Sequence, residues 1–382
     1  MKIMHSVTRI LAIAEKEWIQ VRRDGRSLIL SILLPVLLLL LFAYALNMDV
    51  KRVSVAIFDQ DKSALSRDLL ESFSNTEYFR VQRYVRNYRE IDDLIDRGTV
   101  IMGIVVPRNF ESMYKSGKHV SVQILIDGSD STSATVAGGY VKSIMFSFNR
   151  DLRMRDLNRA GISGIVAPVD VRSRVWYNEE LQSKNFIVPG IIVIVMAIIS
   201  ALITSLTISR EWERGTMETL ITTPVRKYEV YFGKLVPYVL IALFDLIITV
   251  SLGYFVFSVP LRGSFIELYL IALLFLIGTS SLGIMISSAT RSQVLSVQAA
   301  IIITYLPSII LSGYIFPIKN MPGIVQIITY LVPAKYLITV MKGIALKGIG
   351  ASLLWTQIVF LTLYAVVVGA ISLKKLSLKL PE

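Results

Sequence analysis

The stretch FIVPGIIVIVMAIISALITSLTI, residues 186–208, decides what kind of protein this is. It contains no charged residue, and about 20 apolar residues in an α-helix suffice to cross a hydrocarbon core of roughly 30 Å. Five further apolar runs lie at 28–46, 236–257, 266–288, 294–312 and 353–373, the run 294–312 being interrupted by Gln298 and Pro307. The sequence therefore predicts a mainly α-helical membrane protein with six transmembrane helices.

The composition argues against a soluble enzyme. Hydrophobic residues make up 54% of the 382 residues and charged residues only 18%, whereas soluble domains carry roughly 25% charged residues. The chain has no cysteine and only two histidines, His5 and His119, so we expect no zinc cluster, no thiol nucleophile, no other metal site and no catalytic residue. A phosphate-binding G-x-x-x-x-G-K-[ST] loop is also missing, so any nucleotide energy must come from another chain.

The distribution of charge predicts the topology. Residues 1–27 hold six Lys or Arg and three acids, and the residues after 373 hold three lysines and one acid. The polar stretch 47–184 is nearly balanced, with 20 basic and 18 acidic residues. Because positive flanks of spans stay in the cytoplasm, we expect both termini and residues 209–235 inside and residues 47–184 outside. The topology accounts for the net charge of +12, so we expect no nucleic-acid partner.

One segment does not follow the charge rule. Residues 313–352 should lie outside, yet they contain Lys319, Lys335, Lys342 and Lys347 and no acid. Lysine stems can lie along apolar surface while the ammonium reaches the headgroup level, and we expect that arrangement here. Prolines and glycines are also frequent between 307 and 348, within otherwise apolar sequence. This pattern predicts re-entrant or interfacial helices over 313–350.

The remaining domain boundaries follow from periodicity. Residues 1–27 predict an amphipathic helix, with an apolar face made of Val7, Ile10, Leu11, Ala14, Trp18 and Val21. That helix either lies in the membrane interface, which the tryptophan favours, or packs on the protein's own cytoplasmic surface. The run 28–46 follows as the first span, and residues 185–382 form a transmembrane domain with five more helices.

Residues 47–184 predict an extracytoplasmic α/β domain inserted between the first and second spans. Strand signals rich in Val and Ile occur at 53–58, 79–85, 102–107, 120–127 and 169–177. Helices are expected at Ser63–Phe73, with Ser63 as N-cap, at Arg89–Arg97 and over 131–158. The residues Asp127-Gly128-Ser129-Asp130 are expected to form a turn before the last of these helices.

The inward segment 209–235 carries the strongest local signal. Glu211, Glu213, Arg214 and Glu218 alternate with apolar residues, and Met217, Leu220 and Ile221 share one helical face. Gly215 weakens this helix and Pro224 ends it. The segment is either an ordinary amphipathic loop helix or a docking element that carries force from a cytoplasmic motor to the spans.

The run SREWERGTMETLITTPVRKYEVYFGKLVPY, 209–238, resembles the signature of permease subunits of type-two ABC exporters. Residues 16–46, VQILIDGSDSTSA at 122–134, and residues 311–348 fit the same pattern in the same order. The resemblance implies a multi-pass permease of the bacterial cytoplasmic membrane, with an N-terminal elbow helix, that exports an amphipathic or hydrophobic compound. It implies a second permease, identical or paralogous, and two separate ATPase subunits that bind ATP and Mg; this chain would hold no cofactor.

The resemblance also implies which residues dock on the ATPase. By position they form a short coupling helix from Glu211 to Ile221, namely Glu211, Trp212, Glu213, Arg214, Gly215, Thr216, Met217, Glu218 and Leu220. Within the spans, Asp245 is the one acid near the middle of a run. Such a group is costly in a membrane, so it either lines the transport path or bonds to a hydroxyl such as that of Thr279 or Ser280. Thr204, Ser205 and Ser281 are expected to serve helix packing, as are Thr279 and Ser280.

Two other functions remain as alternatives. A membrane receptor would bind a ligand on its external domain and signal inward, but no inward segment here exceeds about 27 residues. An ion-coupled secondary transporter would use charged groups at the midplane and repeated halves, for which Asp245 alone is weak support. A stoichiometric ATPase partner would favour the exporter over both.

Overall fold

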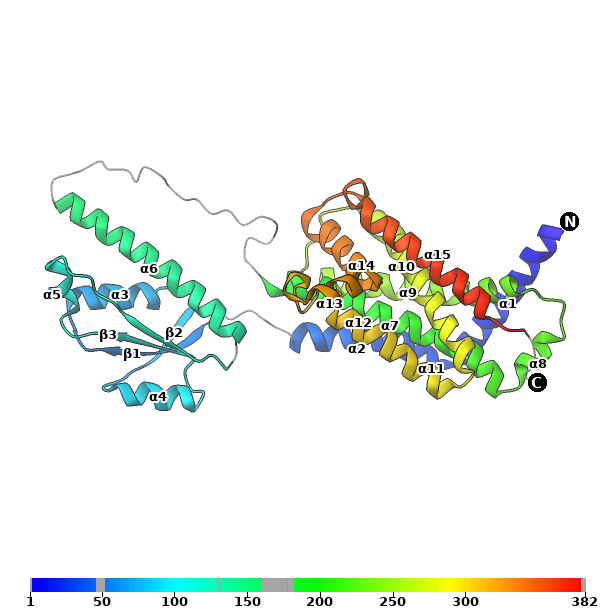
Figure 1. Ribbon diagram of the computed structural model, residues 1–382, viewed down its shortest axis with the longest axis horizontal. Coiled ribbons are helices and arrows are strands. Elements are labelled where there is room, and N and C mark those ends of the chain that lie inside the picture. Colours follow the sequence, from blue (N-terminus) through cyan, green and yellow to red (C-terminus); the bar gives the residue numbers. More distant parts are fainter. Residues whose placement is uncertain (1, 46–51, 130, 160–176, 178–181, 379–382) are drawn as a thin grey trace. The chain divides into compact units, whose positions relative to one another are not determined.

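The computed structural model describes residues 2–45, 52–129, 131–159, 177 and 182–378. The chain divides into two compact units, residues 48–173 and the discontinuous set 1–47 with 174–382. Figure 1 shows a sheet with its helices in the first unit and a helical bundle in the second. Each unit buries its own hydrophobic core.

The smaller unit contains a four-stranded sheet in the order β2-β1-β3-β4. Its strands are β1 (Val53–Asp59), β2 (Phe79–Tyr84), β3 (Met102–Val106) and β4 (Gln123–Ile126). Strand β1 runs parallel to β2 and β3, and β4 is antiparallel to β3. All four lie where the alternating Val and Ile residues predict strands, although β4 is shorter than 120–127. The predicted strand at 169–177 lies outside the described residues, apart from Tyr177.

Helices cover both faces of this sheet, with α3 and α6 on one side and α4 on the other (Figure 1). Their bounds are α3 (Ala64–Ser74), α4 (Tyr88–Asp96), α5 (Phe110–Lys115) and α6 (Ser131–Arg159). The Ser63 hydroxyl accepts the Ser66 N–H at 3.1 Å, so Ser63 is the predicted N-cap of α3. The sequence did not predict α5, because six residues are too few for a periodic signal. Asp127 accepts the N–H of Ser129, which makes the expected turn before α6.

Every regular element among the described residues of the larger unit is a helix. In chain order its first helices are α1 (Lys2–Arg23), α2 (Gly25–Ala45), α7 (Ser183–Glu213), α8 (Thr216–Ile221), α9 (Lys227–Phe255) and α10 (Phe265–Thr290). A broken segment follows as α11 (Gln293–Ala300), the π-helix η1 (Ile301–Tyr305) and α12 (Leu306–Ile310). The chain ends with η2 (Ile318–Asn320), α13 (Gly323–Ile328), η3 (Thr329–Leu331), α14 (Pro333–Lys342), η4 (Gly343–Lys347), η5 (Ala351–Leu354) and α15 (Trp355–Lys375).

Five helices in the described chain are long and apolar enough to cross a membrane, at Ser183–Glu213, Lys227–Phe255, Phe265–Thr290, Gln293–Ile310 and Ala351–Lys375. They coincide with five of the six predicted runs. The first run, 28–46, falls in the 21-residue helix α2, whose described apolar part is Ile32–Tyr44. The helix pair Gly323–Leu331 and Pro333–Lys347 bends by 81° and would bring the candidate spans to six if counted as one span. The protein is thus a mainly helical membrane protein with five to six candidate spans, preceded by an α/β sheet region.

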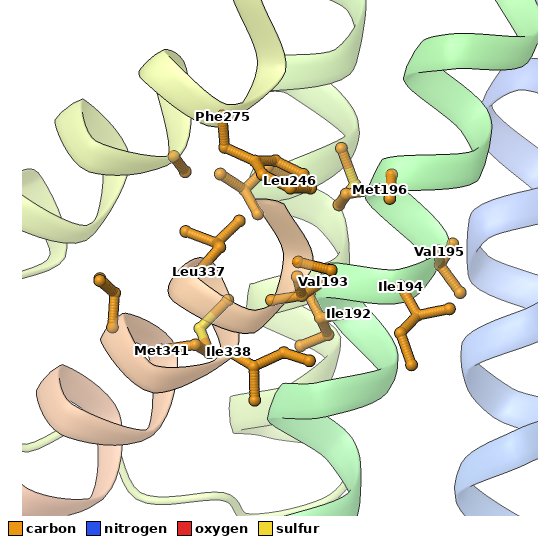
Figure 2. Close-up of a cluster of buried hydrophobic side chains, with 14 of the residues drawn as sticks. Ile192, Val193, Ile194, Val195, Met196, Leu246, Phe275, Leu337, Ile338 and Met341 are labelled. Carbon is orange, nitrogen blue, oxygen red and sulfur yellow. The ribbon is translucent and has the colours of Figure 1, made fainter. Parts of the chain in front are cut away.

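Helix α7 is the centre of the bundle and packs against α2, α9, α10, α11 and α14. Figure 2 shows Ile194 and Val195 on the side of α7 that faces α2, and Leu337, Ile338 and Met341 of α14 on the opposite side. Helix α10 approaches α7 closely at Gly283, where a side chain would not fit: a Cβ built there would lie 2.0 Å from the Thr204 Oγ1.

The small polar residues of these two helices have the packing role that we expected for them. The set Thr204, Ser205, Thr279, Ser280 and Ser281 is buried throughout. Most of these hydroxyls donate to carbonyls of their own helix, and Thr279 also bonds to Ser200 of α7 at 2.8 Å.

Helix α1 packs along α9 through one face and leaves a second apolar face uncovered. Ile13 and Val21 are buried, whereas Val7, Leu11 and Trp18 are 49, 62 and 49% exposed. The helix therefore packs on the protein's own surface, which was one of the two predicted arrangements. The uncovered tryptophan and aliphatic side chains suit the membrane interface, which was the other predicted arrangement.

Candidate functional site

The predicted coupling helix is interrupted in the structure. Residues Glu211–Glu213 are the last residues of α7, and α8 begins only at Thr216. Between them Gly215 has φ +70°, a left-handed conformation that costs glycine little and other residues more. The prediction of one helix from Glu211 to Ile221 was therefore wrong.

Helix α7 is longer than a hydrocarbon core, because its 31 residues measure about 46 Å at about 1.5 Å per residue.

The predicted docking residues divide into a buried and an exposed set. Glu211 and Met217 are 3% and 0% exposed, and Trp212 and Leu220 pack in a cluster with Ile208 and Val230. The two buried side chains hold the turn onto the bundle and are not available to a partner, whereas Trp212 and Leu220 are half-buried. The exposed members are Glu213, Arg214, Gly215, Thr216 and Glu218.

Buried charges join α1, α7 and α9, and we call this cluster the charged junction. Lys234 of α9 is 0% exposed, and its Nζ lies 2.7 Å from Glu17 Oε1 of α1 and 3.0 Å from Glu211 Oε2 of α7. Lys16 pairs with Glu211 from the more exposed side, and the Tyr238 hydroxyl donates to Glu17 at 3.1 Å. Two ammonium groups thus balance two carboxylates, which is the condition for burying charge at an acceptable cost.

A second set of contacts ties α1 to the first turn of α9. Glu229 is 1% exposed and accepts the Ser6 hydroxyl at 2.5 Å and the Arg226 N–H at 2.9 Å. Arg9 lies 3.6 Å from the same carboxylate and donates to the carbonyl of Pro224 at 2.6 Å. The bonds of Ser6 and Arg9 cross between elements, and the charged junction links both helices to α7, so α1, the end of α7 and the start of α9 are held together as one block.

Glu213 connects the turn to a different helix. Its carboxylate accepts the backbone N–H of Gln293 at 2.7 Å and the Gln293 side-chain amide at 2.5 Å. Gln293 is the first residue of α11, so the carboxylate caps that helix and is favoured by its dipole. The Arg291 guanidinium also lies 4.7 Å from the ring centroid of Trp212. The exposed turn is thus bonded directly to the start of the segment α11–η1–α12.

The segment α11–η1–α12 has cavities on both sides. One, of about 340 Å³, lies between α2, α7 and this segment, and its lining includes Leu38, Ile194, Ile198, Tyr305, Ile309 and Tyr314. We call it the α2–α7 cavity. The other, of about 280 Å³, lies toward α10 and α15 and is lined by Thr279, Thr304, Pro307, Ser308 and Tyr364, among others. The π-helix and Pro307 interrupt regular hydrogen bonding in the same stretch, which is how mobile or bent helices are usually built.

Asp245 lies in neither lining. Its side chain is 1% exposed, on the face of α9 that also carries Ala242, Leu246 and Thr249. No hydrogen-bond partner of its carboxylate occurs among the described residues. The bond to Thr279 or Ser280, one of the two roles expected for Asp245, is therefore not formed: Thr279 bonds Ser200, and the Ser280 hydroxyl has no hydrogen-bond partner among the described residues. Within the described chain, no three His, Asp or Glu side chains are grouped as a metal site requires.

A bundle of candidate spans with a charged turn bonded to one of them is an arrangement that suits a membrane transport component. The sequence pattern of the ABC-2 family transporter proteins matches residues 26–374, and the chain belongs to this family as a permease subunit.

Three curated relatives illustrate the similarity. The probable multidrug ABC transporter permease YbhS of Escherichia coli is 33% identical over 361 residues, 94% of each chain. The probable multidrug ABC transporter permease YbhR of the same organism is 28% identical over 351 residues, 89% of this chain and 92% of its own length. The inner membrane transport permease YhhJ of E. coli is 27% identical over 321 residues, 82% of this chain and 81% of its own.

Sequence reasoning missed the charged junction and the bond between Glu213 and Gln293. A signal was present for Lys234, since a lysine directly before an apolar run needs a partner if that end of the helix is buried. The partner could not be found, because Glu17 and Lys234 are 217 positions apart. The bond between Glu213 and the start of α11 could not be predicted, because any acid near the first turn of that helix could have capped it.

Proposed function

We propose that this chain is the permease subunit of an ATP-driven exporter that moves an amphipathic or hydrophobic compound out across the bacterial cytoplasmic membrane. The observation that carries the proposal is the exposed turn and helix α8, bonded through Glu213 to a span that lies between two cavities. Relatives named as probable multidrug permeases and as an inner membrane transport permease support the same function.

The proposed topology has six spans: α2, α7, α9, α10, α11–α12 and α15. The bent pair is re-entrant in this scheme, because its arms of nine and 15 residues measure about 14 and 22 Å, too short for a core of roughly 30 Å. An even number of spans places both termini on the same side of the membrane, and their positive charge assigns that side to the cytoplasm. Residues 48–173 then lie outside between the first and second spans.

The proposed mechanism begins outside this chain. Two ATPase subunits bind ATP and Mg, and each contacts α8 and the exposed residues Arg214, Thr216 and Glu218 of one of two permeases. The charged junction moves as a block with this turn, and Glu213 carries the displacement to α11. The cavities beside α11–η1–α12 leave room for the shift. The ATPase must bind two permease states with different affinity, because otherwise no equilibrium would move.

The α2–α7 cavity is the proposed substrate site. Its lining is almost entirely aliphatic and aromatic, and about 340 Å³ falls at the lower end of small-molecule sites. Such a surface suits the apolar body of a drug-like or lipid-like compound. Asp245 also remains a proposed residue of the transport path, since a buried acid with no described partner is costly in a span.

Purification of the tagged full chain from its native membrane, followed by reconstitution in proteoliposomes, tests the function. We expect a stoichiometric ATPase to co-purify, and ATP-dependent movement of an amphipathic dye that stops when the ATPase is removed. Dye movement driven by an ion gradient without ATP would support the secondary transporter instead. A chain that purifies alone and moves no dye under either condition would support the membrane receptor.

A further inference from the structure

Two of the lysines that do not follow the charge rule, Lys335 and Lys342, lie close against aromatic rings. Lys335 Nζ is 3.8 Å from the ring centroid of Tyr330, and Lys342 Nζ is 3.3 Å from that of Phe186 and 5.9 Å from that of Tyr314. Among the described residues, no carboxylate forms an ion pair with Lys342. A partly buried ammonium held only by ring faces keeps much of its attraction for an anion.

Tyr314 connects this lysine to the α2–α7 cavity. Its hydroxyl donates to the carbonyl of Ile187 at 3.0 Å, and its ring stacks on Phe186 with centroids 6.0 Å apart and planes 10° from parallel. Gly190 makes room for the ring, since a Cβ there would lie 2.2 Å from it. The ring is therefore fixed, and it also forms part of the cavity wall.

The rest of the cavity is uncharged. Along α7 its lining extends from Leu202 to Ile191, and on the α12 side it ends at Tyr314 and Ile315. No charged side chain is among the described lining residues. An elongated ligand therefore meets aliphatic and aromatic surface along its length, and the Lys342 ammonium lies 5.9 Å from the ring of Tyr314 at one end.

We propose that the α2–α7 cavity binds single-chain amphiphiles with an anionic head, and that Lys342 pairs with that head. The inference rests on the proposed function and names its substrate class. The apolar chain lies along α2 and α7, and the carboxylate, sulfate or phosphate replaces part of the ring contact of Lys342 with a charge-assisted hydrogen bond. A cationic head at the same place meets the like charge of Lys342, which no carboxylate among the described residues offsets in an ion pair.

Equilibrium binding to the full chain in phosphatidylcholine nanodiscs tests this proposal. The probes are a pyrene-labelled dodecanoate and a pyrene-labelled dodecyl trimethylammonium of the same chain length. We expect the anion to bind at least about tenfold more tightly than the cation, the size of one charge-assisted bond. Lys342→Gln should remove this preference, Lys342→Arg should keep it, and the exposed control Lys319→Gln should leave it unchanged.

Other outcomes overturn the inference. The proposal is contradicted if both probes bind equally, if neither binds saturably, or if Lys342→Gln keeps the preference for the anion. It is also contradicted if a folded, monodisperse Ile198→Trp variant still binds dodecanoate. Loss of dodecanoate binding in phosphatidylglycerol nanodiscs would show that a lipid, not a free amphiphile, occupies the cavity. The assay needs no ATPase, so a failed export function and a failed head-group preference give different results.

Discussion

Lys234 shows how much of the junction depends on one side chain. It is fully buried, and it offsets the charge of both Glu17 and Glu211 from a single atom. Removing one partner of a buried ion pair is far more damaging than replacing all of them, because the remaining charges stay in the low-dielectric interior.

We therefore expect Lys234→Met to destabilise the helical unit by about 3–5 kcal/mol. Lys227→Met, at the exposed start of the same helix, is the matched control and should have little effect. Thermal unfolding of the detergent-purified proteins measures the difference. Adding Glu211→Gln to Lys234→Met should recover part of the loss, and equal unfolding midpoints for the wild type and Lys234→Met would contradict the account.

The exposed turn gives a second prediction at this scale. Glu213→Ala with Arg214→Ala should abolish transport while the protein remains in the membrane at normal abundance. The glutamate bonds Gln293 and the arginine is exposed, so neither holds the bundle core together. Thr223→Ala, also exposed in the same loop, is the control. Transport at the wild-type rate by the double variant, at equal abundance, would exclude the docking role.

At the scale of elements, the contact between α7 and α10 depends on the absence of a side chain. Gly283→Ala would place a Cβ 2.0 Å from Thr204 Oγ1 and 2.4 Å from the Ala201 carbonyl, so the helices must separate. We expect a loss of about 1–3 kcal/mol, as for an overpacked core. Gly323→Ala, where a Cβ meets nothing within 4 Å, should be tolerated. Comparable melting of the two variants would show that this close approach is not important for stability.

The elements were largely predictable, whereas their contacts were not. Apolar runs of span length and the Val- and Ile-rich strands are local patterns, so helices α7, α9, α10 and α15 and strands β1 to β3 lie where the sequence predicts them. The break at Gly215 was missed because the helical pattern continues through it on both sides. The resemblance placed Glu211 among the docking residues, and its burial could not be predicted because it depends on α1, which only the tertiary structure brings against it.

At the scale of the whole molecule, the cysteine-free sequence allows a direct test of topology. A single cysteine at the exposed position Lys118, in the sheet unit, should react with a membrane-impermeant maleimide in intact spheroplasts. A single cysteine at exposed Thr219, in α8, should react only after the membrane is permeabilised. Equal labelling of both positions before permeabilisation would contradict the proposed arrangement of six spans.

The central claim is that force enters the spans through the turn and α8, and its most direct test is a cross-link to the ATPase. Glu218→Cys, exposed in α8, is coupled to a short reagent that joins cysteine to lysine in the assembled complex. We predict a covalent product between this chain and the ATPase, and none from Lys118→Cys. A complex that transports with ATP yet gives no product from position 218 or 219 would contradict the account.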